Sequence, residues 1–188
     1  MAMSENAKEA ILAAARRTAQ AHGYGGLNFR DIGAEVGIKH ASIYHHFPTK
    51  ADLGAAVAKR YWEDTAGRLE ALVAKAGDPV TAIRAYPGLF RESLEADNRM
   101  CLCSFMAAEY DDLPDAVKTE VQAFADVNVA WLTKMLSAAS GSERGADTRA
   151  SAIYAAIVGA QLVARSRADL GIYDALVDSY RASGLIPA

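Results

Sequence analysis

An all-α protein, with a small N-terminal three-helix domain and a larger C-terminal helical bundle, is the fold class that the sequence predicts. Apolar residues recur at helical spacing, about three and four positions apart, through most of the chain. Hydrophobic residues make up 52% of the 188 residues, enough to bury a core. Alanine, the strongest helix former, is abundant, and no segment alternates like a strand. We therefore expect two domains, over residues 1–52 and 53–188.

The N-terminal domain is expected to contain three helices. They cover residues 5–22, 29–36 and 40–46. Asn28 stands in the N-cap position of the second helix, where its side chain can accept a backbone N–H. Gly37 permits the sharp turn between the second and third helices. Pro48 prevents the third helix from continuing, because the residue before a proline avoids helical angles.

The C-terminal domain is expected to contain six further helices. The first five cover about residues 50–76, 80–96, 100–110, 114–139 and 148–168, and the last carries an apolar stripe from Tyr173 to Tyr180. Thr49 can cap the first of them. Pro87 predicts a kink in the helix over 80–96, since proline disturbs the turn that precedes it.

Charge is distributed unevenly along the chain. The formal net charge is -3, yet residues 1–50 contain six Lys and Arg against four Asp and Glu, and all four histidines. A locally basic end on an acidic protein indicates a polyanionic partner.

The N-terminal residues and the two cysteines bear on the compartment. The segment MAMSENAKEA lacks the apolar core of a secretory signal, and no apolar run approaches the roughly 18–20 residues of a membrane span. Two cysteines are too few for a disulfide scaffold. We expect a cytoplasmic protein with no membrane partner.

Residues 28–53 have the pattern of a helix-turn-helix. Ile32 and Val36 on one short helix, and Ile43 and Phe47 on the next, are spaced to pack against the first helix. The opposite face of the third helix then displays side chains suited to base edges and phosphates. These are Lys39, His40, Ala41, Ser42, Tyr44 and His45.

Residues 31–53 read DIGAEVGIKHASIYHHFPTKADL, and this order resembles the tetracycline-repressor (TetR) family of regulators. The motifs cover about the first 55 residues; Gly33 replaces a usual alanine and Asn28 a usual threonine. The resemblance implies a helix-turn-helix domain followed by an effector-binding and dimerisation domain. It also implies a homodimeric, sequence-specific repressor that leaves a palindromic operator when a small apolar effector binds.

The same resemblance implies which residues contact double-stranded DNA. Tyr44 and Lys50 are expected to hold phosphates, and Ala41 to permit close approach. The side chains expected to face the groove are Lys39, His40, Ser42 and His45. Asn28, at the start of the second helix, completes the predicted DNA-binding set.

A plainer interpretation of this stretch stays open. In this interpretation the three helices form a bundle that does not bind DNA, and Tyr44, His45 and His46 cover its core. A metal site from the histidines is not expected, because adjacent residues on a helix point about 100° apart. No GxGxxG, P-loop, GxSxG or HExxH motif occurs, and so we expect neither an enzyme nor a cofactor.

Small residues on the helix over 148–168 predict a close helix contact. Those assigned to a dimer interface are Ala152, Ala156, Gly159 and Ala160. Small side chains let helices approach, which suits an interface that two subunits build from four helices. The alternative is an ordinary contact within one chain.

Aromatic and amide residues in the middle helices predict an effector pocket. The predicted set is Phe90, Phe105, Asn128, Trp131 and Gln161. Apolar pockets with a few polar groups bind small molecules, and a buried amide needs a partner that a ligand can supply. The alternative is that these residues fill the core.

Cys101 and Cys103 indicate an alternative way of sensing. Two positions apart on a helix they point about 200° apart, so they are not expected to bond each other. Arg99 nearby favours a thiolate, which makes a redox- or electrophile-sensing regulator the alternative function. Their apolar neighbours predict burial instead, which disfavours the thiolate.

Overall fold

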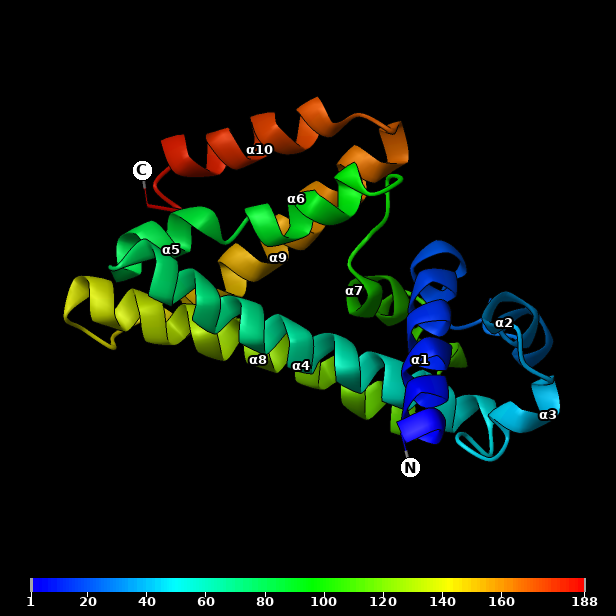
Figure 1. Ribbon diagram of the computed structural model, residues 1–188. Coiled ribbons are helices and arrows are strands. Elements are labelled where there is room, and N and C mark those ends of the chain that lie inside the picture. The colour runs from blue at the N-terminus through cyan, green and yellow to red at the C-terminus, as the bar shows by residue number, and fades with distance from the viewer. Residues whose placement is uncertain (1, 188) are drawn as a thin grey trace. The chain divides into compact units, whose positions relative to one another are not determined.

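The computed structural model describes the backbone of residues 2–187 and the side chains of residues 6–187, and each element in that range is helical (Figure 1). In chain order the helices are α1 (Ala2–His22), α2 (Phe29–Val36), α3 (His40–Ile43), α4 (Lys50–Ala76), α5 (Pro79–Ala85), α6 (Gly88–Glu95), α7 (Leu102–Ala107), the 3-10 helix η1 (Tyr110–Asp112), α8 (Asp115–Ser140), α9 (Ala146–Arg167) and α10 (Leu170–Ala182). The predicted all-α class is confirmed. Within the described range, no helix combines the length and the apolar character that crossing a bilayer requires.

The chain divides into two compact units, each built from segments that are distant in sequence. The N-terminal unit comprises the chain up to Glu63 together with Leu102–Phe124. The C-terminal unit comprises Asp64–Cys101 and the chain from Ala125 onward. These units differ from domains divided after residue 52, because α7, η1 and the beginning of α8 belong with the N-terminal helices. The functional boundary at that position stays a prediction.

The core of the N-terminal unit lies where the periodicity predicts it. Ile11 of α1, Ile32 of α2 and Ile43 of α3 are each at most 1% exposed. Phe47 and Leu53, on either side of the start of α4, are buried as well. Burying a side chain of this size contributes about 1.5–3 kcal/mol. This packing holds α2 and α3, which are too short to be stable as isolated helices.

The helix α3 ends earlier than predicted. The expected helix over 40–46 stops at Ile43, and the next three residues form turns. The N–H of Phe47 donates to the Ile43 carbonyl at 2.8 Å and closes the last of these turns. Pro48 keeps helical angles from Phe47, so the chain cannot return to the helix after these turns.

The predicted single helix over 80–96 was wrong, since the segment forms the two helices α5 and α6. Pro87 separates them, because it has no N–H for the preceding turn and its ring crowds that turn. The Pro87 carbonyl accepts the hydroxyl of Tyr173 from α10 at 2.7 Å. A proline that was expected to bend one helix therefore ends it and provides an acceptor for another.

Both ends of the helix expected over 100–110 also differ from the prediction. The helix expected over 100–110 is the shorter α7, followed by η1. Asp97 and Asn98 lie between α6 and α7 with φ of 59° and 54°. Asp and Asn tolerate this left-handed conformation better than most residues. The turn they make explains why no helix continues through this segment.

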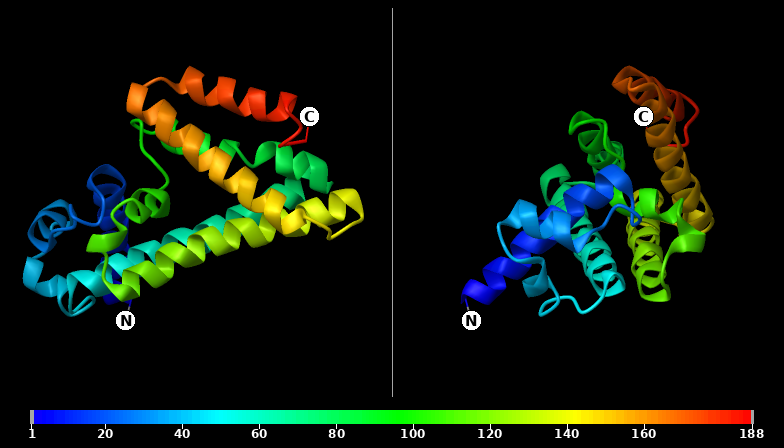
Figure 2. Two further views of the ribbon diagram at one scale, coloured as in Figure 1. Left: turned by 180° about the vertical axis from the view of Figure 1, so that it is seen from behind. Right: turned by 90° about the vertical axis from the view of Figure 1, so that its right-hand side faces the viewer.

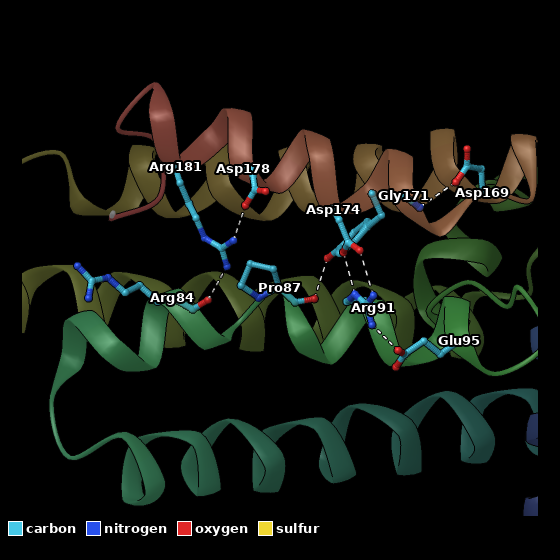
Figure 3. A network of polar contacts seen from close by, with 10 residues as sticks. Arg84, Pro87, Arg91, Glu95, Asp169, Gly171, Asp174, Asp178 and Arg181 are labelled. Carbon is cyan, nitrogen blue, oxygen red and sulfur yellow. Dashed lines mark hydrogen bonds and ion pairs between the residues drawn. The ribbon is translucent and has the colours of Figure 1, made fainter.

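In the C-terminal unit, α9 and α10 lie side by side and α6 packs against both (Figures 1 and 2). Polar contacts join α10 to α6 (Figure 3). The Arg91 guanidinium donates to both carboxylate oxygens of Asp174, at 2.7 and 3.0 Å, and also pairs with Glu95. The hydrogen bonds from Arg91 lower the pKa of the Asp174 carboxyl. Because this pair is solvent-exposed, it contributes only about 0–1 kcal/mol, and apolar packing carries the contact.

Candidate nucleic-acid interface

The second helix of the predicted helix-turn-helix begins with a side-chain cap. The Asn28 Oδ1 accepts the N–H of Arg30 at 2.8 Å and that of Asp31 at 3.4 Å. This satisfies two of the N–H groups that a helix start leaves unpaired. The predicted N-cap is confirmed, while DNA contact by Asn28 stays a prediction.

The turn between α2 and α3 depends on two glycines. Gly37 has φ of 77°, a left-handed conformation that glycine adopts without steric cost. Gly33 faces the start of α3, where an added Cβ would lie 3.0 Å from the Ile38 carbonyl oxygen and 3.2 Å from the His40 nitrogen. The departure from the usual alanine at residue 33 therefore lets the backbone of α3 approach α2 closely.

The part of α3 and its flanking residues that was predicted to meet DNA is open to solvent. The exposed residues are Lys39, His40, Ala41, Tyr44 and His45, and Ser42 is half-buried. Tyr44 is 52% exposed although its ring packs edge-on against Phe29, at 4.8 Å between centroids. Of the residues that the plainer interpretation placed over the core, only His46 is half-buried.

A hollow of about 320 Å³ gathers part of the predicted DNA-binding set. Its lining residues are Leu27, Asn28, Phe29, Arg30, His40, Tyr44 and Lys50. Four predicted residues thus meet there, while Lys39, Ala41, Ser42 and His45 lie outside it. Arg30 was missed, although its place in the first turn of the second helix was a usable signal. Helix starts attract anions, and a guanidinium there suits a phosphate.

Lys50 is held at the edge of this hollow. Its ammonium donates to the Gly25 carbonyl at 2.9 Å and lies 4.7 Å from the centre of the Tyr24 ring. The residues beside it form a reciprocal cap. Thr49 donates its N–H to the Asp52 carboxylate at 3.0 Å, and the Asp52 N–H donates to the Thr49 hydroxyl at 3.1 Å. The predicted capping role of Thr49 is confirmed.

Three residues of the predicted effector pocket gather around Tyr86, which the prediction left out. Tyr86 is fully buried, and its hydroxyl donates to the Asn128 Oδ1 at 2.9 Å. Its ring lies 5.4 Å from Phe90 and stacks on Trp131 at 5.7 Å. Burial raises the pKa of Tyr86 well above its ordinary value. Phe105 lies on α7 in the N-terminal unit.

The buried polar groups near this cluster differ in whether they have hydrogen-bond partners. Gln161 accepts the N–H of Cys101 at 3.0 Å and donates to the Phe90 carbonyl at 2.8 Å, so the fold itself supplies its partners. The Trp131 indole N–H is buried and has no partner among the described residues. Trp131 also lines a groove of about 460 Å³ between α4 and α8. The other lining residues are Ala66, Gly67, Leu69, Glu70, Val127, Ala130 and Lys134.

The predicted dimer face is partly exposed. Ala152 and Gly159 are exposed and Ala156 is half-buried. Ala160 is 1% exposed within a single chain, so its assignment to a subunit interface was wrong. The helical rotation places Ala160 on the inner side, with Ile157 and Ala164.

The two cysteines are buried. Cys101 and Cys103 are each 1% exposed, as their apolar neighbours predicted, and they form no disulfide. The Cys103 sulfur lies 3.9 Å from the Ala58 carbonyl oxygen in the N-terminal unit. Cys101 belongs to the C-terminal unit.

Known proteins resemble this chain over nearly its whole length. A transcriptional regulator of the TetR family from Agrobacterium tumefaciens is 30% identical, with a TM-score of 0.85, over 94% of this chain and 96% of that one. A TetR transcriptional regulator from Legionella pneumophila is 26% identical, with a TM-score of 0.87, over the same shares. FadR from Bacillus subtilis, solved in complex with stearoyl-CoA, shares the fold at 15% identity and a TM-score of 0.74, over 95% and 97%. A search of curated protein sequences finds no match.

The helix-turn-helix itself is matched separately. Residues 11–57 match the sequence profile of bacterial regulatory proteins, tetR family. This range contains α2, the turn and α3, whose exposed face is described above. The match agrees with the 30% identity to the Agrobacterium regulator along almost the full length of both chains. The chain belongs to the TetR family of DNA-binding transcriptional regulators.

Proposed function

We propose that the chain is a homodimeric repressor that leaves a palindromic operator when a small apolar effector binds the C-terminal unit. The observation that carries the proposal is the exposed face of α3 beside the hollow lined by His40, Tyr44 and Lys50. A recognition helix must present side chains beyond the protein surface to enter the major groove. No catalytic step is part of the proposal.

Direct contacts are divided between phosphates and bases in this proposal. Tyr44 and Lys50 hold phosphates, Arg30 adds a guanidinium on the same side, and Ala41 permits close approach. The side chains that read base edges are Lys39, His40, Ser42 and His45. Phosphate contacts fix the register on any duplex, whereas base contacts select the sequence.

Two copies are proposed to associate through the outer face of α9. Leu162 and Val163 are 56% and 46% exposed there, and Ala152 and Gly159 add small residues to the same helix. Removing apolar surface from water drives association. A two-fold dimer presents two copies of α3, so its operator is an inverted repeat with half-sites about 34–36 Å apart.

The effector is proposed to bind beside Trp131 in the C-terminal unit. A buried N–H without a partner is costly, and an acceptor on a ligand satisfies it. The adjoining groove of about 460 Å³ has the size of a small-molecule site. FadR of Bacillus subtilis, which shares the fold, was solved with stearoyl-CoA, and the acyl chain of that ligand supports a ligand with an apolar part in this fold. The effector is therefore an apolar molecule that carries at least one hydrogen-bond acceptor.

Sensing through Cys101 or Cys103 has less support. A reactive thiol needs contact with its oxidant or electrophile, and both sulfurs belong to residues that are 1% exposed. A reagent reaches them only after local opening of the fold. The reversible ligand remains the proposed signal for this reason.

Selection of duplexes from a random-sequence library by the purified protein tests the DNA-binding proposal. We expect an inverted repeat, bound less tightly as salt rises because phosphate contacts release counterions. Lys50→Ala should weaken binding to every duplex, about tenfold, and reduce the slope of log K against log salt by about 1. His45→Ala should instead change the preferred bases.

Lys75→Ala is the matched control, because Lys75 is an exposed lysine in the last turn of the same helix, α4. Its affinity should equal that of the unmodified protein. A library that yields no inverted repeat, or a Lys50→Ala protein with unchanged affinity and salt dependence, would contradict the assigned DNA surface.

A further inference from the structure

Glu109, between α7 and η1, holds the loop that joins α1 to α2. Its carboxylate accepts the backbone N–H of Tyr24 at 2.7 Å and that of Gly25 at 3.4 Å. All three residues belong to the N-terminal unit, although Glu109 and Tyr24 are 85 positions apart in sequence. Hydrogen bonds to a carboxylate are charge-assisted and stronger than neutral ones. The loop conformation therefore depends on a residue far along the chain.

The loop is shaped around this carboxylate. Gly23 has φ of 69°, and a Cβ added to it would overlap the Glu109 carboxylate. The carboxylate thus occupies the space that a side chain at residue 23 would need. On the other side, the Tyr24 ring packs against Gly54. A Cβ added to Gly54 would lie 2.7 Å from a carbon atom of that ring. Both contacts restrict the position of the loop.

The same loop holds Lys50, the proposed phosphate contact. The Gly25 carbonyl accepts one hydrogen bond from the Lys50 ammonium, at 2.9 Å, and the Tyr24 ring lies 4.7 Å from that nitrogen. An ammonium has three donors, so a bond to the loop is compatible with a phosphate contact. The two residues whose N–H groups bind Glu109 are therefore the two residues that hold Lys50.

We propose that Glu109 is a positioning residue for DNA binding. It fixes the loop over 23–26 and, through that loop, the Lys50 ammonium that contacts a DNA phosphate. This inference rests on the proposed phosphate role of Lys50. It also assigns a regulatory route, because a rearrangement of α7 and η1 that withdraws Glu109 releases Lys50 without any contact to α3.

Two simpler roles for Glu109 lead to different results. If only its charge mattered, removing it would strengthen DNA binding, because one negative charge fewer repels the phosphates. If it only stabilised the fold, its loss would lower the melting temperature and leave the salt dependence unchanged. The positioning role requires weaker binding, and the weakening must depend on Lys50.

The experiment measures fluorescence anisotropy of a duplex of about 30 bp that carries the selected inverted repeat, over a salt series. The variants are Glu109→Ala, Glu109→Gln, Lys50→Ala, the Glu109→Ala/Lys50→Ala double variant and Asp111→Ala. Asp111 is the matched control, an exposed acid two positions from Glu109. Melting of each variant by circular dichroism confirms that it is folded at the temperature of the binding measurement.

We expect Glu109→Ala to weaken binding about five- to tenfold and to reduce the salt slope as Lys50→Ala does. The double variant should bind no more weakly than Lys50→Ala alone, since the two residues act as one unit. Glu109→Gln should be intermediate, because its amide oxygen still accepts one N–H. Asp111→Ala should bind as tightly as the unmodified protein, or more tightly. If Glu109→Ala does not fold, Glu109→Gln carries the same test.

The positioning role would be overturned if Glu109→Ala binds DNA as tightly as the unmodified protein. It would also be overturned if the loss of DNA affinity in the double variant equals the sum of the two single losses. In both cases the unmodified protein still binds and Lys50→Ala still weakens binding, so the proposed function stands. If instead the unmodified protein does not bind the duplex, or Lys50→Ala binds unchanged, the proposed function fails and the inference fails with it.

Discussion

Gln161 illustrates how single buried polar residues act in this fold. It is fully buried, and its amide bonds the backbone of Cys101 and of Phe90. Leaving such a group unpaired would cost about 1–3 kcal/mol. The amide thereby ties α9 to α6 and to the segment before α7. A buried amide in a sequence therefore indicates a packing junction as readily as a ligand site.

Tyr86→Phe tests the other buried amide, Asn128. The variant removes the hydroxyl that donates to the Asn128 Oδ1 at 2.9 Å. We expect the free energy of unfolding to fall by about 1–2 kcal/mol, because the core loses one buried hydrogen bond. Urea unfolding at neutral pH measures it. Tyr110→Phe is the control, since Tyr110 is 47% exposed, and it should leave stability unchanged. Equal effects would contradict a role for this hydrogen bond.

The same tyrosine predicts a pH dependence. Burial raises the pKa of Tyr86 well above its ordinary value, so the folded state keeps a proton that the unfolded state releases above about pH 10. This contribution to stability is complete below that pH and is lost as the pH rises further. Unfolding free energy should therefore fall less steeply above about pH 10 in Tyr86→Phe than in the unmodified protein. Parallel curves for the two proteins would refute this assignment.

At the scale of elements, close approach of α2 and α3 rests on backbone geometry. Gly33 leaves room for the Ile38 carbonyl and the first residue of α3, and Gly37 turns the chain with φ of 77°. The short helix α3 gains little stability from its own hydrogen bonds. Its position follows from the turn and from burial of Ile43. The turn therefore fixes the placement of α3, the proposed recognition helix.

Gly37→Ala should lower the free energy of unfolding by about 1–2 kcal/mol, because a Cβ in the left-handed conformation crowds the next carbonyl. No heavy atom lies within 4 Å of the added Cβ, so backbone strain alone causes the loss. Gly67→Ala is the matched control, in the middle of α4 and equally uncrowded. It should raise stability by about 0.5–1 kcal/mol, as alanine favours helices. Urea unfolding of both variants gives the comparison, and shifts in the same direction would contradict the argument.

At the scale of the whole molecule, the main question is what covers the outer face of α9. Leu162 and Val163 are large apolar residues, and more than 40% of each is exposed in a single chain. Gly159 lies one turn before them, and no heavy atom is within 4 Å of a Cβ added there. A subunit partner on this face would bury these residues and allow close helix approach. The same partner would provide the second recognition helix for a palindrome.

Gly159→Arg should convert the dimer to a monomer. The arginine has space in the single chain, so the fold should persist, but a buried unpaired charge at the subunit interface is strongly unfavourable. Light scattering measures the mass, and circular dichroism verifies the fold. Gly67→Arg, at another uncrowded helical glycine, should remain dimeric. A folded Gly159→Arg protein with the mass of a dimer would exclude this face as the interface.

The sequence by itself determined the all-α class, most helix boundaries and the helix-turn-helix. The signals for these features are local: Asn28 caps residues two and three positions away, and Gly37 turns the chain where it stands. Helical spacing likewise identified Ile32, Ile43 and Phe47 as core residues. The exposed set on α3 followed from the same periodicity. A pattern within a few residues is sufficient when the interaction itself spans a few residues.

Only the tertiary structure decided which distant residues meet. Ala160 is buried within its own chain, Gln161 bonds a backbone group 60 positions away, and Glu109 bonds a loop 85 positions away. The hollow that Arg30 shares with Lys50 likewise exists only in the folded chain, although the place of Arg30 in the first turn of α2 was a local signal. Periodicity indicates which face of a helix is apolar, but not which neighbour covers it. The neighbour is chosen by side-chain packing and hydrogen bonding between segments that are remote in sequence.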